Sequence, residues 1–288
     1  MKEITVISGK GGTGKTSLAA SFAALSKNGV STDCDVDAAN LSLLMRPVLQ
    51  EKHEFKASRE ASIRMGMCNR CGLCRELCRF NAITADFQVD PLSCEGCSVC
   101  YRACPEKAID YEEVLSGHWF VSRTPYGPLV HARLGIAEDN SGKLVTQVRN
   151  KARELGKEEK KDWILHDGPP GIGCPVIASL SGATLALIVT EPTPSAIHDM
   201  ERVLEVCRHF QVSAQICINR YDLDEENTSK IETYAKKNRV PLAGRVPLDH
   251  SVTQAMLKGI PVVENNNGPA SKSIKAIWAR LCNGKYTN

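Results

Sequence analysis

Residues 4–16 read ITVISGKGGTGKT, and this stretch decides the fold of the chain. Its first four residues are apolar or β-branched, which is typical of a buried strand in a parallel sheet. Leu18, Phe22 and Leu25 then recur at helical spacing, and Gly29 stands where a C-terminal cap would end the helix. The stretch therefore predicts a strand, a glycine-rich turn and a helix in succession.

Strands and helices alternate over the rest of the chain, outside one interrupted region. We expect further strands at residues 30–35, 163–166, 184–190, 213–219 and 242–246, with helical patterns between them, as at 195–210. This order predicts an α/β fold with a doubly wound, mostly parallel sheet and right-handed crossovers. Residues 273–282 predict a last helix packed on the sheet, and a membrane-targeting amphipathic helix is the alternative.

The composition limits the classes of function. The 288 residues include 36 Lys and Arg against 33 Asp and Glu, a net charge of +3, which is too near balance to predict binding to nucleic acid or to a membrane. No stretch approaches the roughly 18 apolar residues of a membrane span, and the N-terminus has no signal-peptide pattern. Eight of the thirteen cysteines fall between residues 68 and 104. We therefore expect a cytoplasmic protein, in which grouped cysteines are metal ligands.

The glycine-rich turn fits the phosphate-binding loop pattern G-x-x-x-x-G-K-T in full, between a predicted strand and a predicted helix. Glycines let successive backbone N–H groups face phosphate oxygens, and the helix presents the positive end of its dipole to them. Lys15 places a charge at the β and γ phosphates, and the Thr16 hydroxyl is a candidate Mg²⁺ ligand. The residues predicted to bind ATP or ADP here are Gly9, Lys10, Gly11, Gly12, Thr13, Gly14, Lys15, Thr16 and Ser17.

The clustered cysteines form a repeat with an offset of 26 residues. Cys68, Cys71, Cys74 and Cys78 recur as Cys94, Cys97, Cys100 and Cys104. Ala-Ile pairs at 82–83 and 108–109 share the offset, which makes chance implausible. The block breaks the alternation of strands and helices and predicts an inserted module. We expect the first part of the core at 1–60, the insertion at 61–114 and the second part of the core at 115–288.

A second lysine, Lys10, follows the first glycine of the loop. At this point the chain resembles the deviant Walker A family of P-loop ATPases, which includes MinD, ParA, the nitrogenase iron protein and the Mrp cluster carriers. The resemblance covers residues 1 to about 48 and about 115 to 265. It implies a Mg²⁺-dependent ATPase, either intrinsically active or stimulated by a partner, with Lys10 and Lys15 among its catalytic residues. It also implies a nucleotide-dependent homodimer, or a heterodimer with a related ATPase, in which Lys10 reaches the partner's phosphates.

Three further motifs carry this resemblance: Asp-Cys-Asp at 33–35, Asp-Gly-Pro-Pro-Gly at 167–171 and Asn-Arg-Tyr-Asp at 219–222. By position, the resemblance implies that Asp35 orients or activates the attacking water and that Asp33 lies by the metal. It further implies that Asp167 holds the Mg²⁺ shell through water, that the Gly171 amide senses the γ phosphate, and that Asn219 contacts the base.

The cysteine spacing is similar to that of bacterial two-cluster ferredoxins, in which the fourth cysteine of each run serves the other cluster. The resemblance implies a small inserted α+β ferredoxin domain with two [4Fe–4S] clusters. Cluster 1 would take Cys68, Cys71, Cys74 and Cys104, and cluster 2 would take Cys94, Cys97, Cys100 and Cys78. Arg79 departs from the pattern, because it stands where the first run would have its proline. Two Zn²⁺ sites are the competing interpretation, although zinc ribbons pair two C-x-x-C knuckles instead.

The remaining cysteines are predicted to pack in the core. Apolar sequence surrounds Cys34, Cys207, Cys217 and Cys282, which is typical of buried thiols. For Cys174 we also favour packing over a role as a cluster ligand. His166, which precedes Asp167, is expected to be a satisfied buried histidine rather than a residue that faces the nucleotide.

Three hypotheses for the function follow. The first is an ATPase whose dimer and switch cycle drives electron transfer or metallocluster assembly on a redox or metal-cluster-binding protein partner. It rests on the insertion, which leaves the core soon after Asp35 and returns before Asp167. The second is a positioning or scaffold ATPase like MinD or ParA with a redox-sensing module, but the chain lacks an obvious basic arm for DNA. The third is an Mrp-like cluster carrier, but no spare C-x-x-C pair lies outside the block.

Overall fold

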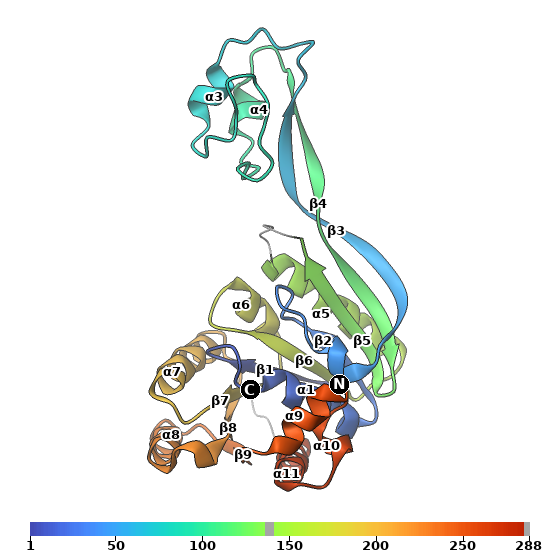
Figure 1. Cartoon of the computed structure of the whole chain (residues 1–288), viewed down its shortest axis with the longest axis vertical. Coiled ribbons are helices and arrows are strands. Elements are labelled where there is room, and N and C mark those ends of the chain that lie inside the picture. Colours follow the sequence, from blue (N-terminus) through green and yellow to red (C-terminus); the bar gives the residue numbers. More distant parts are fainter. Residues whose placement is uncertain (136–140, 285–288) are drawn as a thin grey trace. The chain divides into compact units, whose positions relative to one another are not determined.

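The computed structural model describes residues 1–135 and 141–284, which fall into two compact units (Figure 1). The first unit comprises Met1–His53, Trp119–Arg133 and Ser141–Asn288. The second consists mainly of Glu54–His118. The second unit is therefore an insertion in the chain of the first.

A sheet with the strand order β3-β4-β5-β2-β6-β1-β7-β8-β9 forms the framework. Its strands are β1 (Lys2–Ser8), β2 (Gly29–Asp33), β3 (Val48–Ile63), β4 (Ile109–Thr124), β5 (Gly127–Leu134), β6 (Trp163–Pro170), β7 (Leu185–Thr190), β8 (Ala214–Asn219) and β9 (Leu242–Val246). From β5 to β9 in this order, every neighbouring pair is parallel. The central strands are buried along nearly their whole length, as expected for a parallel sheet that helices cover on both faces. The predicted α/β fold with a mostly parallel sheet is confirmed.

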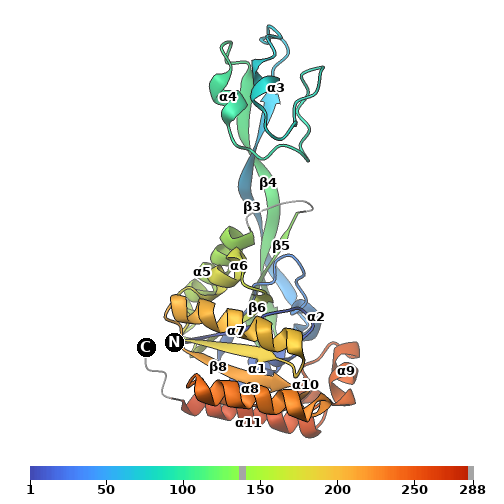
Figure 2. The same cartoon turned by 90° about the vertical axis from the view of Figure 1, so that its left-hand side faces the viewer.

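Helices cover both faces of this sheet in the first unit (Figure 2). They are α1 (Lys15–Ser26), α2 (Ser42–Met45), α5 (Ser141–Glu158), α6 (Cys174–Leu180), α7 (Pro194–His209), α8 (Glu225–Lys237), α9 (His250–Leu257), α10 (Val262–Asn265) and α11 (Pro269–Asn283), with a 3₁₀ turn η1 (Tyr221–Leu223). Helices α1, α9, α10 and α11 pack together with Ile4 and Val6 of β1. Helices α6, α7 and α8 pack with Ile7 of the same strand, whose side chain points to the opposite face.

The first helix ends earlier than the sequence predicts. Helix α1 stops at Ser26, and Lys27, with a φ of 55°, takes the capping position that we expected for Gly29. Gly29 instead begins β2, where a Cβ would lie 2.8 Å from the Ser26 hydroxyl oxygen. The glycine is needed for this close approach and not for a cap.

Two strand ends also differ from prediction, and both differences concern acidic residues. Strand β2 ends at Asp33, so Asp35 lies beyond it rather than at its end. Strand β6 does not stop at His166 but continues to Pro170, because Val6 pairs with Asp167 and Ser8 with Pro170. Asp33 and Asp167 are consequently partners in the register of adjacent strands.

The sequence predicts no strand between residues 48 and 134, yet β3, β4 and β5 lie there. Strands β3 and β4 contribute residues to both units. Charged residues dominate β3, as in the stretch 51–56, and most of them are at least partly exposed, so the strand has no apolar alternation to reveal it. Only Pro125 and Tyr126 connect β4 to its neighbour β5, which makes that pair an antiparallel hairpin.

The last helix packs on the core, as predicted. In α11, Ile274, Ile277, Trp278 and Leu281 are buried. The Trp278 ring stacks on Phe22 of α1 at a centroid distance of 5.4 Å and contacts Trp163 at 5.0 Å. Among the described residues, no helix is long and apolar enough to cross a membrane.

We expect Trp278→Ala to lower the free energy of unfolding of the first unit by about 3–5 kcal/mol. The substitution leaves a cavity beside the rings of Phe22 and Trp163. Lys272→Ala, an exposed substitution in the same helix, should change it by less than about 0.5 kcal/mol. Urea unfolding followed by far-UV circular dichroism measures both values. Equal effects of the two substitutions would contradict the packing of α11.

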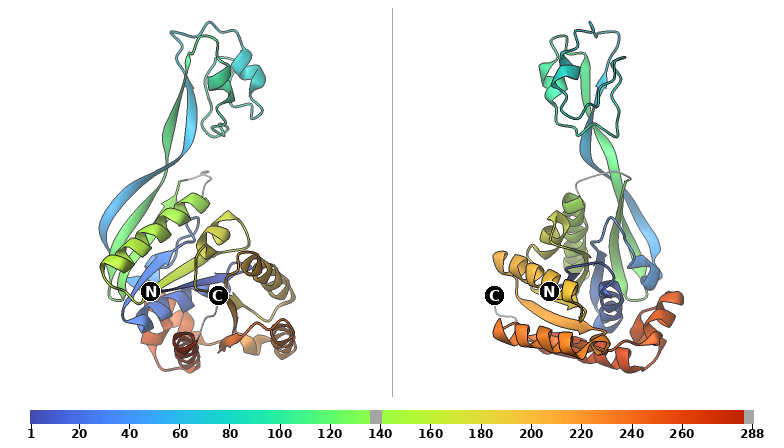
Figure 3. Two further views of the ribbon diagram at one scale, coloured as in Figure 1. Left: turned by 180° about the vertical axis from the view of Figure 1, so that it is seen from behind. Right: turned by 60° about the vertical axis from the view of Figure 1, so that its left-hand side comes forward.

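The second unit has little regular structure beyond the ends of β3 and β4 (Figure 3). Its helices α3 (Leu73–Leu77) and α4 (Val99–Ala103) are related by the 26-residue offset of the cysteine repeat. Each follows a residue of positive φ, Gly72 at 85° and Ser98 at 64°. The buried core consists of Ala61, Cys74, Ile83 and Ile109, against which further cysteines pack. A core of this size rarely holds a unit together without crosslinks or metal centres.

Candidate functional site

The glycine-rich loop lies between β1 and α1, where its local geometry requires glycine. Gly12 and Gly14 have φ values of 80° and 89°, which side chains with a Cβ rarely adopt. A Cβ on Gly14 would also lie 2.4 Å from Nδ2 of Asn219. Lys15 begins the helix and is only 6% exposed, with Thr16 half-buried and Ser17 buried after it. The loop residues that the sequence predicts are thus brought together in one turn.

Two acidic side chains are buried beside this loop, Asp33 at the end of β2 and its register partner Asp167 within β6. Asp33 accepts hydrogen bonds from the backbone amides of Leu41, at 2.9 Å, and Asp35, at 3.1 Å. Asp167 is 1% exposed, and its Oδ1 atom has no hydrogen-bond partner in the described structure. The Thr13 hydroxyl is buried and unpartnered in the same way. Orphaned buried oxygens of this kind need a ligand, because a missing hydrogen bond costs about 1–3 kcal/mol.

Burial raises the pKa values of these carboxyl groups. The pKa of Asp167 rises to about 7, and the nearby Lys15 ammonium only partly opposes the rise. Burial, together with the charge of Asp167, raises the pKa of Asp33 well above its usual range. Burial also raises the pKa of the half-buried Asp35, with Lys15 again opposing. The site therefore concentrates more negative charge than Lys15 alone balances.

This donor set fits Mg²⁺. The hard oxygen atoms of Thr16, Asp33 and Asp167 are the ligand type that Mg²⁺ prefers, directly or through water. A divalent cation would also neutralise the buried carboxylates and supply partners for their oxygens. The residues predicted around the metal are thus compatible with it in type and in charge.

Lys10 points toward the N-terminus of α7 in its own chain. Its Nζ donates hydrogen bonds to Thr193 Oγ1 at 3.2 Å and to Ser195 Oγ at 3.4 Å. Neither partner was foreseen from the sequence, because they lie more than 180 residues away along the chain. Gly9 contacts the same helix so closely that a Cβ on it would lie 2.3 Å from Cβ of Asp199. The loop and α7 therefore form one packed assembly.

Two other predicted residues are engaged in internal hydrogen bonds. The Gly171 amide, expected to sense a phosphate, donates to the Ser8 carbonyl oxygen at 2.9 Å. Asn219, expected to contact the base, donates from Nδ2 to the Thr13 carbonyl oxygen at 2.8 Å. Asn219 thus braces the loop from the end of β8, and its contact with a base stays a prediction.

A buried charge network beneath the site was missed by the sequence analysis. The Arg149 side chain is 2% exposed and donates to Glu3 Oε2 at 2.9 Å, and Arg153 donates to Glu3 Oε1 at 2.7 Å. Burial opposes ionisation of Glu3, but hydrogen bonds and the opposite charges outweigh it and lower the pKa to about 2. His166 lies in this network with Thr32 Oγ1 at 2.7 Å from its Nδ1, and burial lowers its pKa to about 4. The prediction that His166 is buried and satisfied is confirmed.

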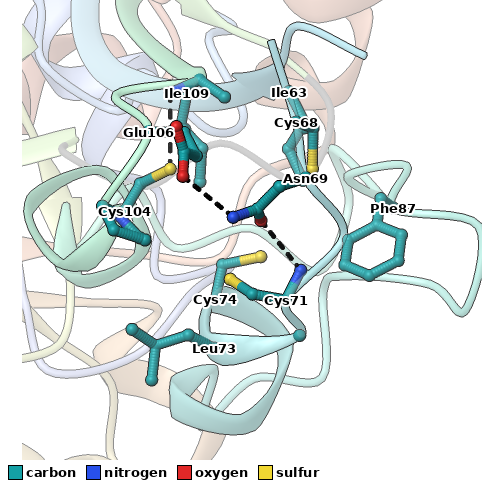
Figure 4. Close-up of a pocket in the computed structure, with 13 residues that line it drawn as sticks. Ile63, Cys68, Asn69, Cys71, Leu73, Cys74, Phe87, Cys104, Glu106 and Ile109 are labelled. Carbon is teal, nitrogen blue, oxygen red and sulfur yellow. Dashed lines mark hydrogen bonds between the residues drawn. The ribbon is translucent and has the colours of Figure 1, made fainter. Parts of the chain in front are cut away.

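The cysteines of the second unit line two separate pockets. Figure 4 shows the first of them, here called pocket 1. The four cysteines that line it are Cys68, Cys71, Cys74 and Cys104, the set predicted for cluster 1. The second, pocket 2, is lined by the set predicted for cluster 2, which is Cys78, Cys94, Cys97 and Cys100. The fourth cysteine of each run therefore lies at the pocket of the other run.

The chemistry of each pocket suits a four-iron cluster. The other lining residues are mostly apolar, such as Ile63 and Ile109 in pocket 1 and Ala61 and Ile83 in pocket 2. Within the described residues, no three His, Cys, Asp or Glu side chains converge on one point as ligands of a single ion do. A four-iron cube takes one thiolate at each iron and does not require such convergence.

The isolated cysteines have different surroundings. Cys34, Cys207 and Cys217 are buried, and burial raises the pKa of each thiol to about 12, which confirms that they pack in the core. Cys282 is half-buried against the same core. Cys174 is exposed as the first residue of α6, so the prediction that it packs is wrong. A bend at residues 171–173 precedes α6, and the first residue of this helix lies at the surface. The sequence pattern did not predict this exposure.

The chain belongs to the family of CobQ/CobB/MinD/ParA nucleotide binding domains, whose model matches residues 4–262. An uncharacterized protein of Methanocaldococcus jannaschii is 35% identical over 282 residues, which cover 97% of this chain and 96% of that protein. An iron-sulfur cluster carrier protein of Pyrococcus abyssi is 27% identical over 156 residues, 49% of this chain and 52% of that protein. The septum site-determining protein MinD complexed with Mg-ADP from Pyrococcus horikoshii shares the fold, with a TM-score of 0.59, 19% identity and coverage of 97% of this chain and 95% of that one.

The raised pKa of Asp167 predicts a pH-dependent stability of the nucleotide-free, metal-free protein. Because folding raises this pKa from 3.8 to about 7, the associated stability is present below about pH 4 and is lost as the pH rises through 7. We expect Asp167→Asn to raise the free energy of unfolding by at least about 1 kcal/mol at pH 8, to raise it less at pH 5, and to have little effect only at about pH 4 or below.

Thermal unfolding in EDTA across this pH range measures the difference. Glu205→Gln, which removes an exposed carboxylate on α7, should leave the unfolding temperature unchanged at both pH values. A destabilising Asp167→Asn substitution at pH 8 would show that the carboxylate is not a source of strain.

Proposed function

We propose that this protein is a Mg²⁺-dependent ATPase that carries two [4Fe–4S] clusters and couples its nucleotide cycle to electron transfer or to metallocluster assembly on a protein partner. The observation that carries the proposal is the distribution of the eight clustered cysteines over two pockets, four to each, with the fourth cysteine of each run exchanged. The family of nucleotide binding domains supports the nucleotide half of the proposal. We propose residues 61–114 as the ferredoxin-like insertion, and 1–60 with 115–288 as the ATPase core.

The nucleotide would bind with its phosphates in the loop at residues 9–17. Amide groups of the loop and the N-terminus of α1 would donate hydrogen bonds to phosphate oxygens, and Lys15 would pair with the β and γ phosphates. Mg²⁺, when bound beside Thr16 and Asp167, would supply charge neutralisation for the phosphates. The half-buried Asp35 would accept a proton from the attacking water, a role for which its raised pKa makes it a better base than an ordinary aspartate.

The cysteine thiolates would hold the two clusters, with the ligand sets described for pockets 1 and 2. Each cluster supplies a one-electron redox centre when bound. The small core of the second unit supports this assignment, since four cluster bonds on each side would replace the missing apolar burial. The protein's own contribution in pocket 1 is an apolar wall that includes Ile63 and Ile109.

Coupling between the two halves would run through the chain connections. The segment that leaves the core follows Asp35 and Asp33, and β3 and β4 are continuous from the core into the insertion. A γ phosphate that reorganised the residues after β2 would therefore act on the same stretch of chain that leads into β3. We propose a dimer that closes on ATP, either of two copies or with a related ATPase, as the state that presents the clusters to a redox or metal-cluster-binding partner.

A second candidate function is delivery of a cluster to an acceptor. Relatives of this chain include iron-sulfur cluster carrier proteins, although they match only about half of it. A carrier must release its cluster, whereas four cysteines at each of two pockets favour retention. Incubation with a cluster-free acceptor ferredoxin distinguishes the two: we expect both clusters to stay in the chain, with or without ATP.

The iron content is the first test of the proposal. The protein isolated without oxygen should contain close to eight irons and eight sulfides per chain, because two four-iron cubes supply them. Cys71→Ser and Cys97→Ser, matched positions of the repeat, should each perturb the cluster of one pocket and leave the other. Zinc in place of iron, or a single perturbed population in both variants, would exclude the ligand sets.

Lys15→Ala should abolish ATP binding and leave the iron content unchanged, because Lys15 lies in the first unit and the cysteines in the second. Lys10→Ala should retain ATP binding and lose ATP-dependent dimerisation. Isothermal titration and sedimentation velocity measure the two properties, with the exposed Lys143→Ala as a control.

A purely intrachain role of Lys10 is tested by Ser195→Ala, which removes one of its two contacts. This variant should dimerise normally with ATP. If Ser195→Ala and Lys10→Ala lost dimerisation equally, Lys10 would act by fixing α7 and not by reaching a second chain.

A further inference from the structure

Pocket 1 directs backbone N–H groups at two of its sulfur atoms. The Arg70 amide donates to Cys68 Sγ at 3.4 Å, and the Ala108 amide donates to Cys104 Sγ at 3.3 Å. The Asn69 side chain fixes the same loop, because its Oδ1 accepts from the Cys71 amide at 3.0 Å (Figure 4). The geometry of these donors is set by the fold and does not depend on a flexible side chain.

One further contact is common to both pockets, because the Arg75 amide donates to Cys74 and the equivalent Tyr101 amide donates to Cys100. Pocket 2 lacks the contacts made by Arg70 and Ala108, although the repeat supplies the same backbone positions. The 26-residue offset relates Arg70 to Gly96 and Ala108 to Ala82. Within residues 54–118, all of which the structure describes, neither of these two amides donates a hydrogen bond to a sulfur atom. The two pockets thus have equivalent cysteines and different hydrogen bonding to them.

Charged groups do not reverse the difference. One carboxylate lines each pocket, Glu106 in pocket 1 and Glu95 in pocket 2. Glu106 Oε1 accepts a hydrogen bond at 2.9 Å from Nδ2 of Asn69, which also lines pocket 1. Burial of one cysteine has the opposite effect on the reduction potential of pocket 1, because a buried site disfavours added negative charge. Cys74 is 8% exposed, whereas its counterpart Cys100 is half-buried. Two N–H dipoles in contact with sulfur outweigh the burial of a single thiolate.

From these contacts we infer that the cluster held by Cys68, Cys71, Cys74 and Cys104 has the higher reduction potential, so that the first electron taken up by the protein resides in pocket 1. Reduction adds one negative charge to a cluster, and N–H donors to its sulfur ligands stabilise the reduced form more than the oxidised form. The inference rests on the proposed function, since it requires both clusters.

This order assigns different roles to the two pockets. A low-potential donor protein is oxidised by one electron, and this protein is reduced by that electron. The electron then moves to pocket 1, whichever pocket receives it first. Pocket 2 then fills only when a second electron arrives. The chain would therefore hold one electron ready in pocket 1 and use pocket 2 as the relay.

The experiment is an anaerobic redox titration of the full-length protein with dithionite, followed by EPR. Two one-electron steps should separate, with pocket 1 reduced in at least tenfold preference to pocket 2 at half reduction, which corresponds to about 59 mV or more. The pair Glu106→Gln and Glu95→Gln assigns the steps, because each removes one carboxylate from one pocket without a change in size. Glu106→Gln should raise the potential of the first step alone, and Glu95→Gln that of the second step alone.

Three results would overturn the inference: a single step in which both clusters are reduced together, a first step that responds to Glu95→Gln, or steps that respond equally to both substitutions. Should Glu106→Gln lose iron, Asn69→Asp tests the same pocket by adding a charge, and it should lower the potential of the first step. Failure of the proposed function is recognised separately, because the wild-type protein would then lack eight irons per chain.

Discussion

The nucleotide-binding half of the molecule depends on one electrostatic constraint. Two carboxylates are buried side by side on adjacent parallel strands, next to the phosphate-binding loop. Asp33 and Asp167 are partners in the strand register, and burial raises the pKa of both. Within the loop, a hydrogen bond from Thr16 and the positive charge of Lys15 both favour the ionised form of Asp167. The glycines that turn the loop, and Asn219, which braces it at Thr13, hold Lys15 in place. A magnesium ion bound with a nucleotide would add positive charge beside these two carboxylates.

Much of this half of the fold can be predicted from the sequence, because its signals are local. The strand at 242–246 and the helix that follows the loop come directly from apolar patterns and glycine positions. The Glu3–Arg149 pair has no such signal, since its partners lie 146 residues apart and neither belongs to a motif. For the same reason the contacts of Lys10 with Thr193 and Ser195 were missed. Strand β3 was not predicted, because its exposed charged residues interrupt the alternation of apolar and polar residues on which strand prediction relies.

For the cysteine block, the sequence predicts how the cysteines are grouped but not how they are hydrogen-bonded. Its internal repeat predicts two equivalent halves, and the structure places α3 and α4 at the same offset. The resemblance to two-cluster ferredoxins also predicts which cysteines gather at each pocket, whereas their binding of iron stays a prediction. What the repeat does not predict is the asymmetry between the pockets. The Arg70 and Ala108 amides reach sulfur atoms through small differences in backbone path, which residue types alone do not determine.

The position of the insertion between β2 and β6 bears on the order in which the chain folds. Thr32 pairs with His166, 134 residues further along, so the central sheet closes a long loop. Loop-closure entropy grows only slowly with length, by about 0.6 kcal/mol for each doubling. An insertion left unfolded would therefore hardly weaken the sheet around it. Under the proposed function, chains made without enough iron would still bind nucleotide but could not transfer electrons to a partner.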